Sequence, residues 1–248
     1  MTEKLSNEEL ERRFRDVEEN WKVIRENIAA AAEKSGRGDG DVTFLAATKT
    51  VPVEVINRSI ALGVANIGEN RVQELMEKYD AYDLAHSRLH FIGRLQVNKV
   101  KYLVGRVAMI QSVDSEKLAG EISRLSVKKG VTTDVLLEVN IGREENKSGV
   151  SPELLPELLG RVSALPAVRV RGLMAIPPAG ASEAETENYF LRMNRYFIDT
   201  KSKKIDNVSM DYLSMGMSAD YAQAIATGAN LVRVGTALYG PRVYRKNG

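Results

Sequence analysis

The chain has 248 residues, of which 44% are hydrophobic, and this is enough material for one large domain or two small ones. Its 35 basic and 33 acidic residues leave a formal net charge of +2, so the composition gives no reason to expect nucleic acid or a membrane as a partner. There is no cysteine, which excludes disulfides and thiolate ligands, and with only 2 histidines we expect no metal site. The sequence has no signal peptide and no apolar segment of membrane length, so we expect a soluble, cytoplasmic protein.

The N-terminal segment predicts one long amphipathic helix over residues 6–35. It opens with Ser6-Asn7-Glu8-Glu9, which fits a capping box. Apolar residues then follow at alternating spacings of four and three, namely Leu10, Phe14, Val17, Trp21, Ile24 and Ile28. The same stripe would suit a coiled coil, but a single helix is seldom stable alone, so we expect it to pack on the rest of the chain.

Beyond residue 41 the sequence alternates between short β-rich runs and helical stretches. The expected strands are 42–49, 64–68, 89–93, 109–113, 133–140, 168–176, 207–215 and 231–235. The expected helices are 53–62, 70–79, 95–104, 115–129, 152–163, 182–200 and 218–228. This alternation predicts an α/β protein, a single (β/α)₈ TIM barrel with an extra N-terminal helix, and residues 1–248 as one domain. A doubly wound open sheet is the alternative, although its Gly-x-Gly-x-x-Gly turn is not found.

The first candidate for chemistry is Lys49, at the end of the first expected strand. Strand alternation places Lys49 on the same face as Leu45 and Ala47. If that face points inward, removal from water disfavours the charged form and makes the free amine, which attacks carbonyls, more accessible. A lysine at a strand end can also extend into solvent, so Lys49 alone does not decide between these alternatives.

A second inward-facing cation lies in the last expected strand. Alternation places Arg233 on the face of Leu231 and Gly235. A buried arginine keeps its charge and needs an acceptor, which could be a strand carboxylate such as Asp211 or Glu138. Inward cations on the first and last strands suggest an anionic ligand that bears a carbonyl group and lies between them.

Two turns provide suitable groups for a phosphate. Barrel enzymes often bind phosphate with the loops that follow strands seven and eight. Here those loops contain Ser214 and Ser218 on one side and Gly235-Thr236 on the other. Glycine permits close backbone approach, hydroxyl groups donate hydrogen bonds, and helix-start N–H groups favour an anion. Each turn is also compatible with ordinary helix capping, but their combination favours a phosphate site.

Five segments, in this order along the chain, resemble the signature blocks of the pyridoxal phosphate homeostasis proteins. They are Leu-Ala-Ala-Thr-Lys-Thr at 45–50, Ile-Gly-Glu-Asn-Arg-Val-Gln-Glu at 67–74, His-Phe-Ile-Gly-Arg-Leu-Gln-Val-Asn-Lys at 90–99, Leu-Ser-Met-Gly-Met-Ser at 213–218 and Val-Arg-Val-Gly-Thr at 232–236. The resemblance implies a barrel similar to the N-terminal domain of alanine racemase, with pyridoxal 5′-phosphate (PLP) as cofactor.

The resemblance also implies a role for each candidate residue. Lys49 would hold PLP as a Schiff base, and Arg233 would donate to the pyridine nitrogen. Asn70 would lie near the ring or its phenolic oxygen, whereas His90 is at least as well explained as a structural strand residue. The phosphate would be held by Ser218, Gly235 and Thr236, with Ser214 nearby.

The implied function is PLP binding in intracellular PLP homeostasis without established catalytic turnover. PLP-dependent apoenzymes are the expected partners, and a monomer or a weak homodimer is the expected state. The alternative is a PLP-dependent amino-acid racemase, which uses a second base and an additional C-terminal β domain. We expect neither here, since no tyrosine can be assigned opposite Lys49 and little chain follows the last strand. A phosphate-binding barrel without PLP would leave Lys49 unexplained.

Overall fold

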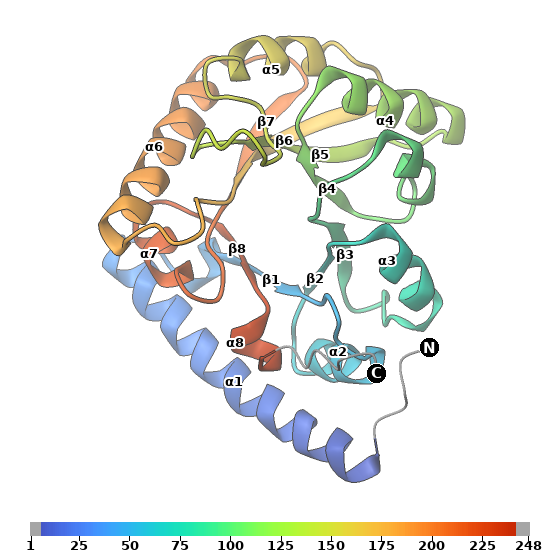
Figure 1. Cartoon of the computed structure of the whole chain (residues 1–248), viewed down its shortest axis with the longest axis vertical. Helices are drawn as coiled ribbons and strands as arrows, with labels where there is room; N and C mark the ends of the chain where they lie inside the picture. The colour runs from blue at the N-terminus through green and yellow to red at the C-terminus, as the bar shows by residue number, and fades with distance from the viewer. Residues whose placement is uncertain (1–5, 242–248) are drawn as a thin grey trace.

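Eight parallel strands close into a barrel in the computed structural model of the protein, which describes residues 6–241 (Figure 1). Each strand pairs with the next, and β8 pairs with β1, so the prediction of a barrel is confirmed and an open sheet is excluded. The strands are β1 (Thr43–Ala47), β2 (Asn66–Glu69), β3 (Arg88–Phe91), β4 (Met109–Val113), β5 (Thr133–Val139), β6 (Val168–Ala175), β7 (Val208–Ser214) and β8 (Leu231–Val234).

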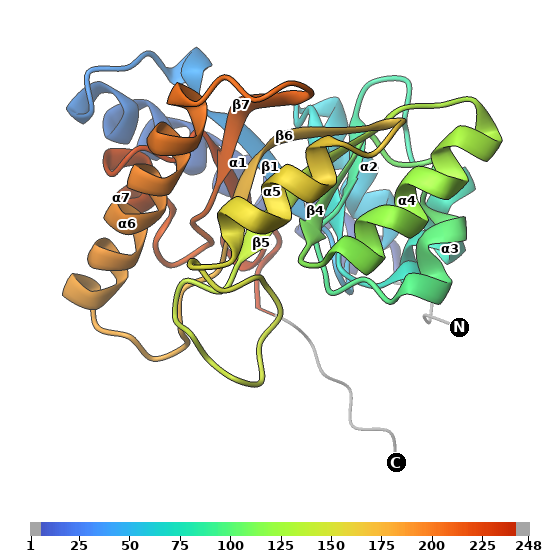
Figure 2. The same cartoon turned by 90° about the horizontal axis from the view of Figure 1, so that it is seen from above.

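The helices lie outside the ring of strands, as Figures 1 and 2 show from two directions. They are α1 (Asn7–Lys34), α2 (Val53–Ala61), α3 (Val72–Lys78), α4 (Glu116–Lys129), α5 (Leu155–Ser163), α6 (Glu183–Ser202), α7 (Tyr221–Ala226) and α8 (Thr236–Tyr239). Short 3₁₀ segments are η1 (Asp39–Asp41), η2 (Tyr79–Ala81) and η3 (Val97–Tyr102). Within the described part of the chain, no helix combines the length and apolar character needed to cross a membrane.

Several expected elements differ in their bounds from those found, among them α5, which begins at Leu155 and not at 152, and three differences affect the rim of the barrel. The α-helix expected over 95–104 is the 3₁₀ segment η3, in which Val97 and Val100 are β-branched and disfavour an α-helix. The helix expected over 218–228 begins only at Tyr221, because Met217 and Asp220 form a turn closed by a backbone bond of 3.1 Å. The strand expected over 42–49 ends at Ala47, so Lys49 lies just beyond the strand.

Helix α1 covers the seam where the barrel closes. The capping box is present, with Ser6 Oγ accepting from the Glu9 backbone N–H at 3.2 Å. The apolar stripe faces the body of the protein, and α1 contacts α2, α7 and α8, which flank β1 and β8. Two side chains of this helix bond to the covered elements: Trp21 Nε1 donates to the Leu62 carbonyl at 3.0 Å, and Asn20 donates to the Leu238 carbonyl at 3.0 Å.

The barrel interior holds two small apolar clusters together with buried polar side chains. One apolar cluster consists of Leu45, Ala47, Ile92 and Leu231, and a second of Met109, Leu136 and Met174. The larger hydrophobic core lies between the strands and the surrounding helices. On β8, Arg233 is the inward-facing residue after Leu231, and on β3, His90 is the inward-facing residue before Ile92; both polar residues are buried. Arg233 and His90 thus belong to a buried polar layer inside the barrel, which we call the floor.

Candidate functional site

The rim of the barrel at the carboxyl ends of the strands gathers most of the candidate residues. In the β1–β8 ladder, Leu45 is directly opposite Arg233. Lys49 follows β1, and it is half-buried. The turn after β8 lies against the same strand end, since a Cβ atom added to Gly235 would approach the Ala47 carbonyl oxygen to 3.1 Å. The first and last strands thus bring Lys49, Arg233 and Gly235 into one region.

The turn after β7 is bonded to the turn after β8. Ser218 Oγ accepts hydrogen bonds from the backbone N–H groups of Gly235 and Ala237, each at 3.1 Å. These N–H groups belong to the start of α8, where Thr236 is exposed. Because Ser218 acts here as acceptor, its own proton remains available for an anion placed above the turn.

Arg233 is buried and its guanidinium is held by neutral acceptors. Its Nη1 donates to Ser214 Oγ at 2.6 Å and its Nη2 donates to the Ala175 carbonyl at 3.1 Å. Burial lowers the pKa of Arg233 to about 10, opposed by the charges of Glu138 and Asp220, so the group is still cationic at neutral pH. Among the described residues no carboxylate lies within ion-pair distance of it.

The bonds of Arg233 continue as a chain across the barrel. Ser214 Oγ donates to Gln111 Oε1 at 2.7 Å, and Gln111 Nε2 lies 3.0 Å from Nδ1 of His90. The chain joins β8 and β7 to β4 and β3 on the opposite side of the barrel (Figure 1). It gives each of these buried side chains a hydrogen-bond partner, which avoids the cost of an unsatisfied polar group.

His90 ends this chain as a neutral acceptor. The Gln111 amide donates to Nδ1, which assigns the imidazole proton to Nε2. Burial, together with the charge of Arg88, lowers the pKa of His90 to about 4. A proton on Nδ1 would face the amide donor, so the hydrogen-bond geometry also favours the neutral ring.

Glu138 lies in the same interior, on β5. It is buried and accepts from Ser148 Oγ at 2.8 Å. Burial raises the pKa of Glu138, while the Ser148 hydrogen bond and the charges of Arg233 and Arg94 oppose that rise. Neither carboxylate considered as a partner of Arg233 is hydrogen-bonded to it. Glu138 accepts from Ser148, and Asp211 pairs with Arg171 at 2.6 Å. The described residues contain no group of three or more histidine or acidic side chains suited to a metal ion.

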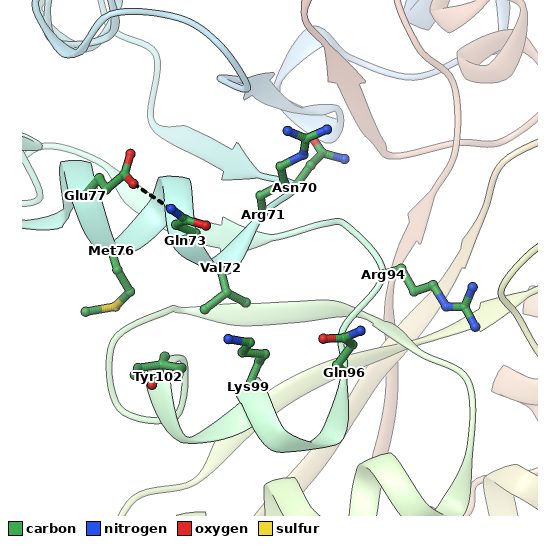
Figure 3. A pocket seen from close by; sticks show the side chains of 10 residues that line it. All are labelled: Asn70, Arg71, Val72, Gln73, Met76, Glu77, Arg94, Gln96, Lys99 and Tyr102. Atoms are coloured by element: carbon green, nitrogen blue, oxygen red, sulfur yellow. Dashed lines mark hydrogen bonds between the residues drawn. The ribbon is translucent and has the colours of Figure 1, made fainter. Parts of the chain in front are cut away.

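A groove of about 870 Å³ lies beside the rim, between α3 and η3 (Figure 3). Asn70 and Arg94 line it at one end, and Tyr102 lines it at the other. The ammonium group of Lys99 lies 5.7 Å from the centre of the Tyr102 ring. Asn70 follows β2, and its Oδ1 atom is buried without a hydrogen-bond partner in the described structure. Asn70 therefore joins this groove to the rim.

Comparison with known proteins identifies the family. Residues 20–243 match the family described as "Alanine racemase, N-terminal domain". A protein of Aquifex aeolicus named "Pyridoxal phosphate homeostasis protein" is 45% identical over 221 residues, covering 89% of this chain and 96% of that protein. The protein of the same name from Escherichia coli K12 is 35% identical over 234 residues, covering 93% and 99%. The chain belongs to the pyridoxal phosphate homeostasis protein family.

Solved structures agree with this family and with the barrel. PipY of Synechococcus elongatus PCC7942, described as having PLP bound, is similar with a TM-score of 0.75 and 33% identity, covering 86% of this chain and 100% of PipY. Alanine racemase from Corynebacterium glutamicum has a TM-score of 0.67 at 15% identity, covering 88% of this chain and 61% of the racemase. At that identity the racemase shows a common fold alone.

The structure distributes the predicted site residues over three places, which are the rim, the floor and the groove that Asn70 lines. Lys49, Ser218, Gly235 and Thr236 lie at the rim, and Arg233 lies on the floor beneath it. Ser214 is fully buried and bonds to Arg233, so its hydroxyl serves the floor instead of the turn that contains Gly235.

Two further residues with bonds to the site, Gln111 and Glu69, are not among those predicted from the sequence. Gln111 joins Ser214 to His90, and Glu69 accepts from the residue that precedes Lys49. A polar residue at the inward position after Met109 was the available signal for Gln111. Glu69 lies inside the block at 67–74 that carries the family resemblance, but the sequence pattern alone does not show its contacts.

We predict that His90 contributes to the loss of stability at low pH. The unfolded side chain titrates near 6.5 and the folded one near 4, so the unfolded state binds the additional proton between these values. This contribution is full above pH 6.5 and is lost as the pH falls to 4. His90→Gln should therefore reduce the decline in unfolding free energy over that range by an amount on the order of 3 kcal/mol, measured by urea denaturation.

The matched control is His86→Gln, which removes the exposed histidine that pairs with Asp83. Glutamine at position 90 can still accept from Gln111 through its side-chain oxygen. An unchanged pH dependence in His90→Gln would contradict a neutral, buried role for this ring.

Proposed function

We propose that this protein binds PLP at the carboxyl-end rim of the barrel, holds it covalently through Lys49 and serves in intracellular PLP homeostasis. The observation that carries the proposal is the arrangement of an amine and a buried guanidinium on adjacent strands, with the Ser218-bonded turn beside them. The bound PLP described for PipY, a relative at 33% identity, supports the same cofactor.

The site fits the phosphate of PLP. The backbone N–H groups of the Gly235–Ala237 turn converge on Ser218 Oγ, and Thr236 is exposed at the start of α8. Gly235 has no side chain to fill the space beside Ala47, where an added Cβ would already be crowded. Ser218 and Thr236 would donate their hydroxyl protons to phosphate oxygens.

Arg233 fits the ring nitrogen of the cofactor. The guanidinium lies buried on the floor, where Ser214 and the Ala175 carbonyl use only part of its donor capacity. Because Arg233 retains its charge, a hydrogen bond from it would keep the ring nitrogen unprotonated. Asn70, with an unpartnered Oδ1, would lie near the phenolic oxygen.

Lys49 would supply the covalent link. Its amine would act as the nucleophile toward the aldehyde group of PLP, with water as the leaving group. When bound, PLP supplies an electron sink, and an unprotonated ring nitrogen makes that sink weaker. This suits storage and delivery of a reactive aldehyde better than carbanion chemistry.

Two buried tyrosines of the surrounding elements have hydroxyl groups that are already bonded, which favours the carrier function over racemisation. Racemisation needs one acid–base group on each face of the substrate carbon. Tyr82 and Tyr239 are buried, and their hydroxyls bond to Glu69 and Ser59 at 2.8 Å. Burial raises the pKa of both tyrosines, so their hydroxyls stay protonated at neutral pH and are not available to accept a proton. Delivery of PLP to apoenzymes, a monomeric or weakly dimeric state and a cytoplasmic location complete the proposal.

We predict that borohydride reduction of the protein loaded with PLP attaches the cofactor to the peptide that contains Lys49. Lys49→Ala should lose this label, and Lys99→Ala, which changes an exposed lysine of the groove, should keep it. Mass spectrometry of the digested protein identifies the labelled peptide. A label that is found only on another lysine would overturn the assignment of Lys49.

Removing the hydroxyls of Ser218 and Thr236 together should weaken PLP binding by a few kcal/mol. Hydrogen bonds to a charged group are worth about 1.5–3 kcal/mol each. The double variant Ser218→Ala/Thr236→Val is compared by equilibrium dialysis with Thr132→Val, which removes an exposed hydroxyl just before β5, at the opposite rim. Equal affinity of the double variant and the wild type would place the phosphate elsewhere.

We expect no enzyme-like racemisation by the PLP-loaded protein. The measurement is α-proton exchange in deuterated water, with chiral analysis, over a panel of L- and D-amino acids. Lys49 can serve one face of the substrate carbon, and Arg233 withholds the strongest electron sink. Catalytic interconversion of enantiomers that is abolished by Lys49→Ala would establish a racemase instead.

A further inference from the structure

A buried carboxylate lies directly behind the turn that carries Lys49. Glu69, the last residue of β2, has no exposed surface. Its Oε1 accepts from Thr48 Oγ1 at 2.8 Å, from the Tyr82 hydroxyl at 2.8 Å and from Lys78 Nζ at 3.1 Å. Burial raises the pKa of Glu69, and the charge of Lys78 and the hydrogen bonds from Tyr82 and Thr48 to one oxygen oppose that rise by favouring the ionised carboxylate.

Lys78 extends this cluster to the residues on both sides of Lys49. Its ammonium group donates to the Thr48 carbonyl at 3.3 Å and to Glu74 Oε1 at 2.6 Å. The same oxygen of Glu74 accepts from the backbone N–H of Thr50. The residue before Lys49 and the residue after it are therefore both bonded to one group of charged side chains from β2 and α3.

The turn needs such support because its backbone is strained. Thr50 has a φ of 63°, in the left-handed region that β-branched residues rarely adopt. A residue held there costs of order 1–3 kcal/mol and persists only where its surroundings impose it. The bond from Thr50 to Glu74 supplies one such constraint, and Pro52, at the N-cap of α2, limits the backbone just beyond it.

The cluster also determines which way Lys49 points. Phe44 and Ala46 face the helices, and the alternation continues with the buried Thr48, whose hydroxyl is held by Glu69 on that side. Leu45 and Ala47 face the barrel interior. With Thr48 fixed outward and Thr50 fixed by Glu74, Lys49 is directed to the inner side of the rim.

We propose that Glu69, Glu74 and Lys78 are positioning residues for Lys49, which hold the Thr48–Thr50 turn so that the lysine amine reaches a carbonyl carbon bound at the rim. This inference rests on the proposed function, since Lys49 is the attachment point there. The three side chains act through their bonds to Thr48 and Thr50 and not by contact with the ligand.

The test separates bond formation from binding. PLP can form the bond with Lys49, whereas pyridoxine 5′-phosphate carries an alcohol in place of the aldehyde and can only occupy the site. The rate of C=N bond formation is followed by stopped-flow absorbance, and the dissociation constant of pyridoxine 5′-phosphate is measured by calorimetry. The variants are Glu69→Gln and Glu74→Gln, with Glu77→Gln as the matched control on the same helix, where Glu77 is exposed and bonded to Gln73.

We expect Glu69→Gln and Glu74→Gln to slow bond formation by about 10-fold or more, the scale on which misplacement of a reacting group acts. Their affinity for pyridoxine 5′-phosphate should stay within about 2-fold of wild type, since the residues that hold the ring and the phosphate are unchanged. Glu77→Gln should match wild type in both measurements. Bond formation at the wild-type rate in the variants would overturn the proposal, as would a parallel loss of affinity and rate.

A milder variant keeps the test decisive if Glu69→Gln does not fold. Thr48→Val removes only the hydroxyl that donates to Glu69 and keeps the shape of the side chain. It should also slow bond formation while leaving pyridoxine 5′-phosphate affinity unchanged, and a wild-type rate would contradict the role of Glu69. A wild-type protein that forms no bond at Lys49 would overturn the proposed function itself, whereas a wild-type protein that bonds normally leaves the variants to decide positioning alone.

Discussion

Closure of the barrel by the pairing of β1 with β8 is the constraint on which the site depends. The two strands come from opposite ends of the sequence, and their ladder places Leu45 opposite Arg233. Every further relation at the rim follows from this register, including the approach of the Gly235 turn to Ala47. Helix α1 covers the seam from outside, so the N-terminal segment stabilises the junction that forms the site.

The floor of the site shows how a cation is kept inside a hydrophobic barrel. Burying a charge is costly unless polar groups replace the lost water. Arg233 donates to the Ser214 hydroxyl and to the Ala175 carbonyl. The Ser214 hydroxyl in turn donates to Gln111, whose amide bonds to His90. Because these partners are neutral, the guanidinium retains its positive charge for an anionic or basic group above it. A carboxylate partner would have cancelled that charge.

The rim is supported from the other side of the barrel wall. Polar groups on the helix-facing side of β1 and β2 hold the strained turn at Thr48–Thr50. The proposed position of the Lys49 amine is on the opposite, inward side. Such strain at a turn is consistent with a functional constraint, because threonine adopts a left-handed conformation only at an energetic cost. Within this segment, Thr48 and Thr50 make the bonds that hold the turn, and Lys49 between them is the proposed attachment point of PLP.

Much of this organisation was predictable from sequence, because it depends on local patterns. The period of two predicts Lys49 and Arg233 as inward-facing, and the alternation of elements predicts the barrel and its N-terminal helix. The site's polar contacts were not predictable, since Ser214 and Gln111 are 103 residues apart and Arg233 meets the Ala175 carbonyl across 58 residues. The apolar spacing also failed at η3, where a 3₁₀ segment buries Val100 as an α-helix would. Sequence by itself determined which side chains face inward, through the pleat of each strand. Only the closed barrel decided which of them meet, because its register joins residues that no local pattern relates.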